Sequence, residues 1–451
     1  MEASLFKTNK KNKLRIESYS HSTCRVRETR LSEYRDFDDA LQVTTPLHDE
    51  TIVVTENSIT TGVMKISIDE RGYIDFNRLG ENKPRIRERK SPRALIEGGR
   101  SLKSVGGDLF KAEVLFASYD DEKIWGMGQH QYNALDQKGL ILPLNQMNSQ
   151  VSVPFYISSR GYGLFWNNPG VGQVEFARNR TRFVMNATPQ IDYFIIIADT
   201  PEKILEEYYT LTGFPSPLPS WSTGFWQCKL RYETQEELLI VAREYKKRNL
   251  PISAIVIDYF HWEKQGNWDF DKKCWPEPEK MVKELKEMGI ETLVSVWPTV
   301  NPDSLYFNEM ENSGYLIEAE KGNASFMRFT DTYEKGVKYL HYYDATNPEA
   351  REFLWNILKK NYVERGIKAF WLDACEPEII PYDYENLRYH TGNGAAVSSI
   401  YPFLHEKTIY ENMKASGIEQ PLNLCRSAWC GSQKYGVLVW SGDIDSTFES
   451  L

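Results

Sequence analysis

The sequence lacks any long apolar stretch. No window approaches the roughly 18 consecutive apolar residues that a membrane-spanning helix needs. The first residues include several lysines, but no apolar core of about 7–15 residues follows them, so they do not form a secretory signal. We therefore expect no membrane partner.

Cysteine is scarce and scattered. The six cysteines form no CxxC pair and have no histidine spacing typical of zinc sites. Neither an HxH nor an HExxH arrangement occurs, so the sequence gives no support for metal-assisted hydrolysis. The expectation is a cytoplasmic protein with reduced thiols, no metal and no cofactor.

A basic excess is also missing, whereas aromatic residues are abundant. The chain has 54 Lys and Arg against 63 Asp and Glu, a net charge of −9, which argues against a nucleic-acid partner. Aromatic residues make up 13% of its 451 residues. They could fill a core or line a site for a sugar ring, and composition alone leaves both interpretations open.

The first half of the chain has a sequence pattern typical of antiparallel β-proteins. Short β-rich runs alternate with turn residues, which predicts a β-sandwich domain over residues 1–215. A Pro-rich junction at residues 213–220 favours an extended connection over a helix. The predicted strands are residues 51–55, 62–68, 151–157, 162–166, 182–185 and 193–197.

From residue 220 to 451 the pattern changes to alternating strands and helices. Strands that are almost continuously apolar are buried on both faces, which predicts a parallel sheet. The lack of a Gly-rich phosphate loop favours a (β/α)8-type TIM barrel over a doubly wound sheet. We expect about six barrel strands and an irregular insertion at about residues 298–345. The strands are predicted at residues 224–230, 252–260, 291–297, 367–373, 422–426 and 437–440, and helices at residues 235–248, 277–288 and 348–365.

Charged side chains stand at the carboxyl ends of these strands, where the active site of a β/α barrel lies. Hydrolysis of a glycosidic bond needs one carboxylate to attack the anomeric carbon, another to protonate the leaving oxygen, and aromatic rings to hold the sugar. The pattern therefore predicts a carbohydrate-active site. Its candidates, in strand order, are Asp258, Trp297, Asp373, Glu376, Arg426 and Asp443.

Each candidate also has a purely structural interpretation. An Asp at a strand end is often the N-cap of the following helix. Arg426 could form an ordinary ion pair with one of the acids, and a tryptophan such as Trp371 could belong to the core. Three acids at three strand ends nevertheless favour the catalytic interpretation.

Several motifs resemble those of glycoside hydrolase family 31, which contains α-glucosidases and α-xylosidases. Residues 370–378 (FWLDACEPE) resemble its nucleophile motif. The motifs follow the family's order from about residue 110 onward, so the chain is identified as a member. The other matching segments are residues 426–429 (RSAW), 431–435 (GSQKY) and 440–443 (WSGD) in the acid/base region, residues 257–259 (IDY) at the substrate-binding aspartate, and residues 125–129 (WGMGQ) and 165–168 (FWNN) in the β-sandwich domain.

The resemblance implies a role for individual residues. Asp373 matches the nucleophile and Asp443 the general acid/base, while Asp258 and Arg426 match residues that bind hydroxyls of the terminal sugar. The implied function is a retaining exo-α-glycosidase that releases terminal α-linked glucose or xylose from oligosaccharides by double displacement. The aromatic candidates for substrate contact are Trp297, which lies beside the third-strand position lining the pocket, and Trp371 and Trp440, which belong to the matching motifs.

Two departures from the family pattern leave alternatives open. The family's barrel continues for two strands beyond the acid/base, and one of them supplies a histidine, whereas this chain has eight residues after Asp443. We therefore expect an incomplete barrel, with a truncated, non-catalytic carbohydrate-binding protein as an alternative to the glycosidase. An α-glucan lyase of the same family is a further alternative. Tyr259 stands where xylose-preferring members tend to have a small or sulfur residue, so the choice of sugar stays open, and a homo-oligomer is compatible with the sequence.

Overall fold

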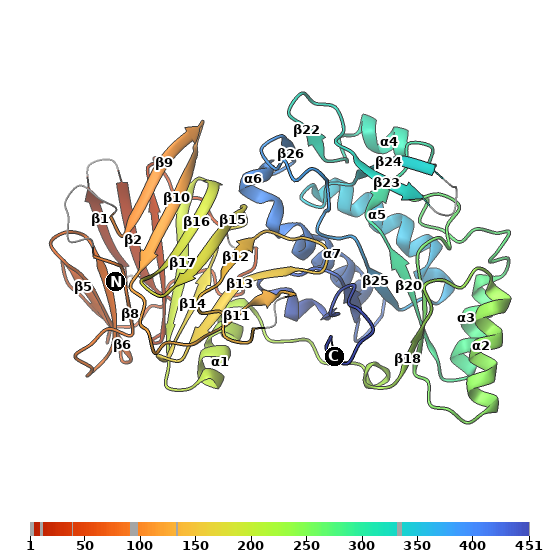
Figure 1. The fold of residues 1–451 in the computed structure, drawn as a ribbon, viewed down its shortest axis with the longest axis horizontal. Helices are drawn as coiled ribbons and strands as arrows, with labels where there is room; N and C mark the ends of the chain where they lie inside the picture. Colours follow the sequence, from red (N-terminus) through yellow and green to blue (C-terminus); the bar gives the residue numbers. More distant parts are fainter. Residues whose placement is uncertain are drawn as a thin grey trace.

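The computed structural model describes residues 4–450 except for residues 10–11, 38, 91–97, 132–133 and 332–335. Figure 1 shows two regions side by side: antiparallel sheets, coloured red to yellow, and a parallel sheet with its helices, coloured green to blue. Within the described ranges, no helix has the length and apolar character needed to span a bilayer.

Three antiparallel sheets build the N-terminal region. Trp166 of the first sheet stacks on Phe183 of the second with ring centroids 4.7 Å apart, and Ile66 and Phe76 of the third sheet join the same core. In spatial order, the first sheet contains β1 (Ser4–Asn9), β2 (Asn12–Ser18), β3 (Thr23–Thr29), β17 (Gln190–Ile197), β14 (Tyr162–Trp166), β13 (Val151–Ser158) and β11 (Ile124–Gln129). The second contains β12 (Ile141–Leu144), β15 (Gly172–Ala177), β16 (Arg180–Thr188), β10 (Leu109–Phe116) and β9 (Arg100–Gly106), and the third β4 (Val53–Val54), β5 (Ser58–Thr60), β6 (Met64–Ile68), β7 (Ile74–Arg78) and β8 (Ile86–Arg87).

A six-stranded parallel sheet organises the second region, and its strands follow one another in chain order. They are β18 (Trp226–Cys228), β19 (Ala254–Ile257), β20 (Glu291–Val296), β25 (Ala369–Leu372), β28 (Asn423–Cys425) and β29 (Val437–Val439). Each lies within a strand predicted from the sequence and is shorter than predicted, because the apolar runs extend past the last ladder hydrogen bonds. The parallel sheet is therefore confirmed.

Helices cover one face of this sheet and share a large core with it. The side chain of Thr234 accepts a hydrogen bond from the Glu237 N–H and caps α2, while Asn347 caps α5 ahead of Pro348. These caps are the signals that begin a helix. The helices are α2 (Gln235–Lys247), α3 (Pro278–Glu287), α5 (Pro348–Asn361) and α7 (Tyr401–Ala415). The first three correspond to the three helices predicted from the sequence. The other face carries a smaller cluster around Ala254, Leu293 and Ala369.

The prediction of an irregular insertion at residues 298–345 was wrong in part. The segment contains α4 (Phe307–Asn312) and a three-stranded antiparallel sheet. These strands lie in a stretch without regular apolar alternation, so no periodic pattern marked them. The antiparallel elements are β21 (Thr299–Val300), β24 (Gly336–Tyr342) and β23 (Met327–Asp331), together with β22 (Glu318–Ala319), which pairs with β26 (Leu387–Tyr389) and through it with β27 (Gly392–Asn393). Other elements that were not predicted include α1 (Pro201–Thr212), α6 (Gly394–Val397) and the 3-10 turns η1 (Ser220–Thr223), η2 (Val363–Arg365), η3 (Ser398–Ile400) and η4 (Ser432–Tyr435).

The two regions share a hydrophobic cluster, so they are packed against each other rather than joined only by a linker. Phe155 of β13 stacks on Tyr208 of α1 with centroids 4.0 Å apart, and the same cluster includes Phe403 of α7 and Tyr435 of η4. One face of the first sheet is thereby held against the end of the chain that carries the last two parallel strands.

Candidate active site

The charged candidates lie at one edge of the parallel sheet. Asp258 follows β19 directly, Asp373 follows β25 and Arg426 follows β28. Asp443 lies four residues beyond β29. Since the strands are parallel, their carboxyl ends point to the same side, which is where active sites occur in β/α barrels.

Arg426 lies between several acids. Its Nη1 is 3.1 Å from Asp373 Oδ1, and its Nε and Nη2 donate to the two carboxylate oxygens of Glu376 at 2.6 and 3.0 Å. Glu378 Oε2 is 3.5 Å from Nη2. The ion pair considered from the sequence therefore exists, and its bidentate part joins Arg426 to Glu376, which fixes the guanidinium plane. Arg426 remains free to contact Asp373 through its third nitrogen.

Two carboxyl groups of the site, those of Asp373 and Asp258, have raised pKa values because they are buried without full compensation of their charge. Asp373 is 6% exposed, and burial raises its pKa to about 6 although the Arg426 charge lowers it. Asp258 is 5% exposed, and burial raises its pKa to about 8, with further increases from the charges of Asp373 and Asp443. Its hydrogen bond from the Tyr259 N–H, at 2.6 Å, only partly offsets the cost of burying the charge. Such shifts in neighbouring acids are typical of catalytic sites.

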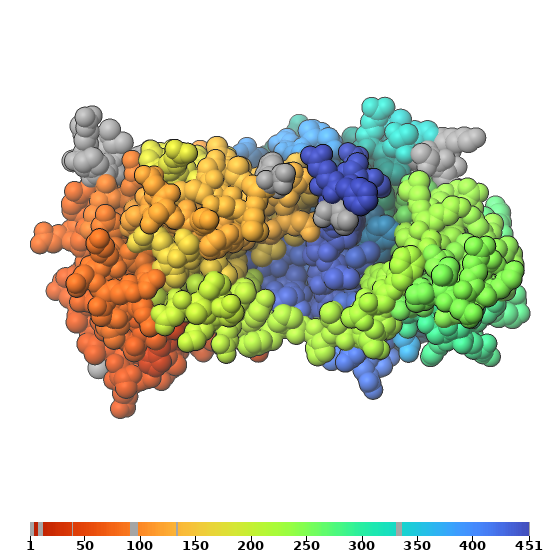
Figure 2. Space-filling model, turned by 60° about the horizontal axis from the view of Figure 1, so that its bottom comes forward, coloured from red at the N-terminus to blue at the C-terminus, as the bar shows by residue number. Residues whose placement is uncertain are grey.

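Asp443 is exposed, but its charge raises the pKa of both Asp258 and Asp373. Its backbone N–H donates to Ser149 Oγ at 3.1 Å, and the carbonyl of nearby Trp440 accepts a hydrogen bond from Gln129 Nε2 at 2.7 Å. In Figure 2 the dark-blue end of the chain accordingly lies beside the orange residues of the N-terminal region. Asp258, Asp373 and Asp443 therefore lie close enough for their charges to interact, and hydrogen bonds with the N-terminal region help to place Asp443.

Aromatic side chains form the walls of this edge. Trp297, after β20, stacks on Tyr259 with ring centroids 5.4 Å apart, while Trp371 and Trp440 meet edge to face at 5.3 Å. Among the described residues, no protein acceptor contacts the buried indole N–H of Trp297 or of Trp371. A buried donor without a partner carries an energetic penalty that a ligand hydroxyl could relieve.

The helix-cap interpretation of the aspartates is wrong for the helices described. The N-cap residues of α2, α3 and α5 are Thr234, Glu277 and Asn347. Asp258 and Asp373 each accept a hydrogen bond from the next residue's N–H instead. Within the described ranges, no group of three or more His, Cys, Asp or Glu side chains is arranged to hold a metal ion.

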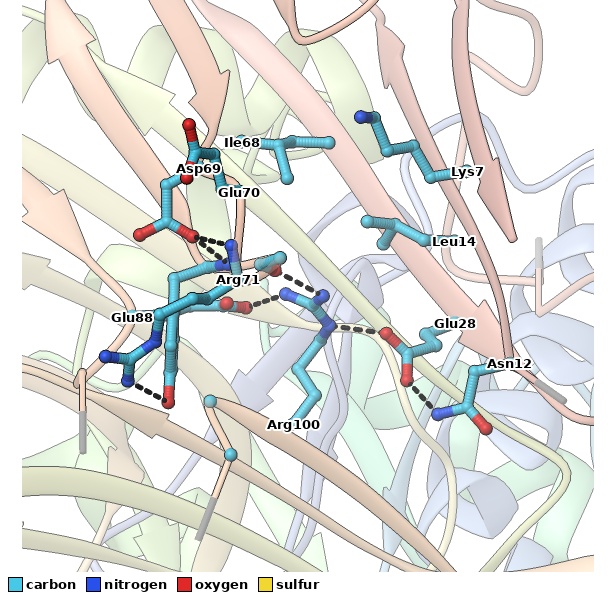
Figure 3. Close-up of a pocket in the computed structure, with 14 residues that line it drawn as sticks. Lys7, Asn12, Leu14, Glu28, Ile68, Asp69, Glu70, Arg71, Glu88 and Arg100 are labelled. Carbon is cyan, nitrogen blue, oxygen red and sulfur yellow. Dashed lines mark hydrogen bonds and ion pairs between the residues drawn. The ribbon is translucent and has the colours of Figure 1, made fainter. Parts of the chain in front are cut away.

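A second cluster of buried charge lies in the N-terminal sheets, beside a cavity of about 480 Å³ (Figure 3). Arg100 Nε donates to Glu28 at 2.5 Å, its Nη1 to Glu88, and its Nη2 to the carbonyl of Gly72 at 3.0 Å. Asn12 donates to the same Glu28 at 2.6 Å. The charges here are paired with one another, so we interpret the cluster as structural.

The residues that sequence reasoning missed come from the N-terminal region. Gln129 belongs to a matching motif, but nothing in the motif showed that it contacts Trp440. Gln146 and Ser149 lie in the turn between β12 and β13 and had no signal at all, because their partners lie almost 300 residues away.

A curved parallel sheet with converging carboxylates, a buried arginine and indoles at its carboxyl edge is the layout of a glycosidase built on a β/α barrel. Comparison with known proteins agrees with this class. The model of the glycosyl hydrolases family 31 TIM-barrel domain matches residues 215–451. The chain belongs to glycoside hydrolase family 31.

The relatives are named as glucosidases and xylosidases. The uncharacterized family 31 glucosidase ORF2 of Pseudescherichia vulneris is 40% identical over 97% of this chain and 85% of its own length. Alpha-xylosidase A of Aspergillus niger is 34% identical over 76% of this chain and 50% of its own. A GH31 α-xylosidase from a soil metagenome, solved in complex with xylose, is 43% identical with a TM-score of 0.93, covering all of this chain and 68% of that one. The chain thus spans about half the length of the Aspergillus relative it matches.

Proposed function

We propose that this protein is a retaining exo-α-glycosidase in which Asp373 is the nucleophile and Asp443 the general acid/base. The observation that carries the proposal is the contact of Arg426 with a buried Asp373 whose pKa also responds to the Asp443 charge. Arg426 favours the ionised form of Asp373, which is the form that attacks. Retention requires a separation of roughly 5–5.5 Å between the two carboxyl groups during the reaction.

In the first step, a carboxylate oxygen of Asp373 bonds to the anomeric carbon while the bond to the leaving oxygen breaks. Asp443 gives its proton to that oxygen. In the second step, Asp443 takes a proton from water, whose oxygen bonds to the anomeric carbon and displaces Asp373. Two inversions leave the sugar in its original α configuration.

Asp258, Arg426 and the aromatic walls are proposed to bind the terminal sugar. In this arrangement, Asp258 accepts hydrogen bonds from sugar hydroxyls, and the indole N–H groups of Trp297 and Trp371 donate to others. Trp440 covers the ring from the Asp443 side. We propose a terminal α-linked xylose first and α-linked glucose second, because α-xylosidases are prominent among the relatives. The lyase and binding-protein alternatives have no such support.

We propose that the architecture follows the division expected from the sequence: a β-sandwich domain over residues 1–215 and a (β/α)8-type barrel with six strands over residues 220–451. The shared core of the first two sheets and the chain-order parallel sheet support it. The six free cysteines support a reducing, cytoplasmic location.

The proposal is tested by incubating the purified protein with p-nitrophenyl α-xyloside and α-glucoside and following the first-formed sugar by proton NMR. We expect release of p-nitrophenol and initial appearance of the α anomer. Inactivity on every aryl α-glycoside would refute the glycosidase, initial β anomer would refute retention, and an unsaturated sugar would identify a lyase.

A further inference from the structure

Gln146, in the turn between β12 and β13, is a buried amide whose hydrogen-bonding groups are all used. The side chain is 3% exposed. Its Nε2 donates to the carbonyls of Ser152, Ser399 and Ala428 at 3.0, 3.3 and 2.9 Å. Its Oε1 accepts from the Ser152 N–H and from Ser427 Oγ, each at 2.9 Å. One side chain of the N-terminal region therefore holds two segments of the barrel region.

Two of these partners, Ser427 and Ala428, directly follow Arg426. Both are buried, so their polar groups have little access to water. On the other side, the Arg426 N–H donates to the carbonyl of Leu372 at 3.2 Å, at the end of the strand that carries Asp373. The backbone at Arg426 is thus fixed by β25 from one side and by Gln146 from the other.

We infer that Gln146 is a positioning residue of the active site, which fixes the chain after Arg426 and so aims its guanidinium at Asp373. The inference rests on the proposed role of Asp373 as nucleophile. Packing of the two regions against each other does not require Gln146, since the hydrophobic cluster around Phe155 and Phe403 already joins them. A fully satisfied buried amide instead specifies one geometry, because any displacement leaves polar groups unpaired.

Gln146→Met is the direct test, since methionine has a similar length but cannot form the five hydrogen bonds. We expect kcat to fall about 10- to 100-fold, the range for a small misplacement of a catalytic group, with a smaller change in KM. We call the fall of kcat/KM at low pH its acidic limb. In the wild type the midpoint of this limb should lie near pH 6, because Asp373 must be ionised to attack. If Arg426 is less well aimed, the pKa of Asp373 rises and the limb moves to higher pH.

Gln190→Met is the matched control. Gln190 is another fully buried amide, and it bonds within the N-terminal region: its Nε2 donates to the Arg35 carbonyl at 2.7 Å and its Oε1 accepts from the Arg35 N–H at 2.8 Å. The control should lose stability but keep the wild-type kcat and acidic limb. Ser427→Ala removes only the hydroxyl that donates to Gln146, so it should shift the acidic limb in the same direction by a smaller amount. It replaces Gln146→Met as the test variant if Gln146→Met does not fold.

Hydrogen exchange of the peptide spanning residues 423–432 supplies a readout that needs no activity. Faster exchange there in Gln146→Met or Ser427→Ala, but not in Gln190→Met, supports positioning. A folded Gln146→Met or Ser427→Ala with wild-type exchange, kcat and acidic limb would overturn it. If the wild type hydrolyses no aryl α-glycoside, the proposed function fails, and the exchange comparison still decides whether Gln146 orders the Arg426 segment.

Discussion

Arg100 in the N-terminal sheets and Arg426 at the barrel edge are both arginines held between two buried carboxylates. Arg100 bonds Glu28 and Glu88, and Arg426 bonds Glu376 and contacts Asp373. The clusters differ in what surrounds them. Arg100 also satisfies a backbone carbonyl, and Asn12 satisfies Glu28, whereas the barrel edge adds further acids.

Asp258 shows the difference most clearly. Among the described residues, no lysine or arginine pairs with its carboxyl group, and its pKa is raised to about 8. Burying a charge without a partner is expensive, so folding alone gives no reason to retain it. Both carboxylates that hold Arg100 are thus paired with a cation, whereas Asp258, at the edge where we propose chemistry, is buried without one in the described part of the chain.

The largest effect is expected from removing Asp373, the proposed nucleophile. Asp373→Ala should lower kcat on every substrate by at least about 10³-fold, because no other group forms the covalent intermediate. The protein should remain folded, since the change removes a buried carboxyl and leaves Arg426 paired with Glu376. Steady-state kinetics with circular dichroism measure both. Near-normal activity in the folded variant would mean that the unbalanced cluster is not catalytic.

Asp443→Ala should have an effect that depends on the leaving group. We expect a loss of about 10²- to 10⁴-fold on disaccharides, which need a proton on the leaving oxygen, and near-normal glycosylation by α-glycosyl fluorides, which do not. Azide should accelerate turnover and give an α-glycosyl azide by attacking the covalent intermediate. In Asp373→Ala, azide should instead attack the anomeric carbon of the α-glycosyl fluoride directly. This attack displaces fluoride and gives the β-glycosyl azide. An Asp443→Ala loss that is equal for all leaving groups would contradict the acid/base role.

Arg100→Met tests the other half of the comparison. Leaving Glu28 and Glu88 buried without their cation should lower the free energy of unfolding by about 3–5 kcal/mol, while kcat of the folded fraction stays unchanged. Burial already raises the pKa of Glu88, and removal of the Arg100 charge raises it further, so the loss should be larger at high pH than at low pH. Urea unfolding at pH 5 and pH 8 measures this.

The double variant Arg100→Met with Glu88→Gln is the control for charge balance. It removes one of the two acids together with the cation, so part of the lost stability should return. A kcat change in Arg100→Met comparable to that in Asp373→Ala would show that the two clusters do not differ in role.

Two acids of the candidate site could be placed from the sequence because each follows a strand with a clear apolar pattern. Asp258 and Asp373 follow such strands directly, and parallel strands bring their carboxyl ends together without any knowledge of side-chain contacts. Arg426 was found in the same way, although the bidentate partner Glu376 was only one of several acids nearby. Periodicity thus identified the edge of the sheet but not the pairing on it.

Other features depend on contacts that no local pattern encodes. Gln146 is an ordinary polar residue in a turn until the fold brings it to Ser427 and Ala428, 281 and 282 residues away. The β23–β24 hairpin was likewise unpredicted, since its strands pair within an insertion that lacks regular alternation. Helix α1 is different, because Thr200 and Pro201 are visible start signals that sequence reasoning did not use.

The last prediction concerns the pH dependence of stability at Asp258. Its folded pKa of about 8 lies above the ordinary aspartate value of 3.8, so the folded state holds a proton that the unfolded chain releases. This contribution to stability is fully present below about pH 4 and is lost as the pH rises towards about 8, with a slope of at most about 1.4 kcal/mol per pH unit. Asp258→Asn has no such proton, so urea unfolding between pH 5 and pH 8 should show a flatter profile than the wild type. Glu81→Gln is the control of opposite sign: the hydrogen bonds from Arg85 lower the pKa of Glu81, so its contribution is lost only as the pH falls, and the profile between pH 5 and pH 8 should match the wild type. Equal slopes for Asp258→Asn and the wild type would mean that the charge on Asp258 is balanced after all, and the contrast with the Arg100 cluster would disappear.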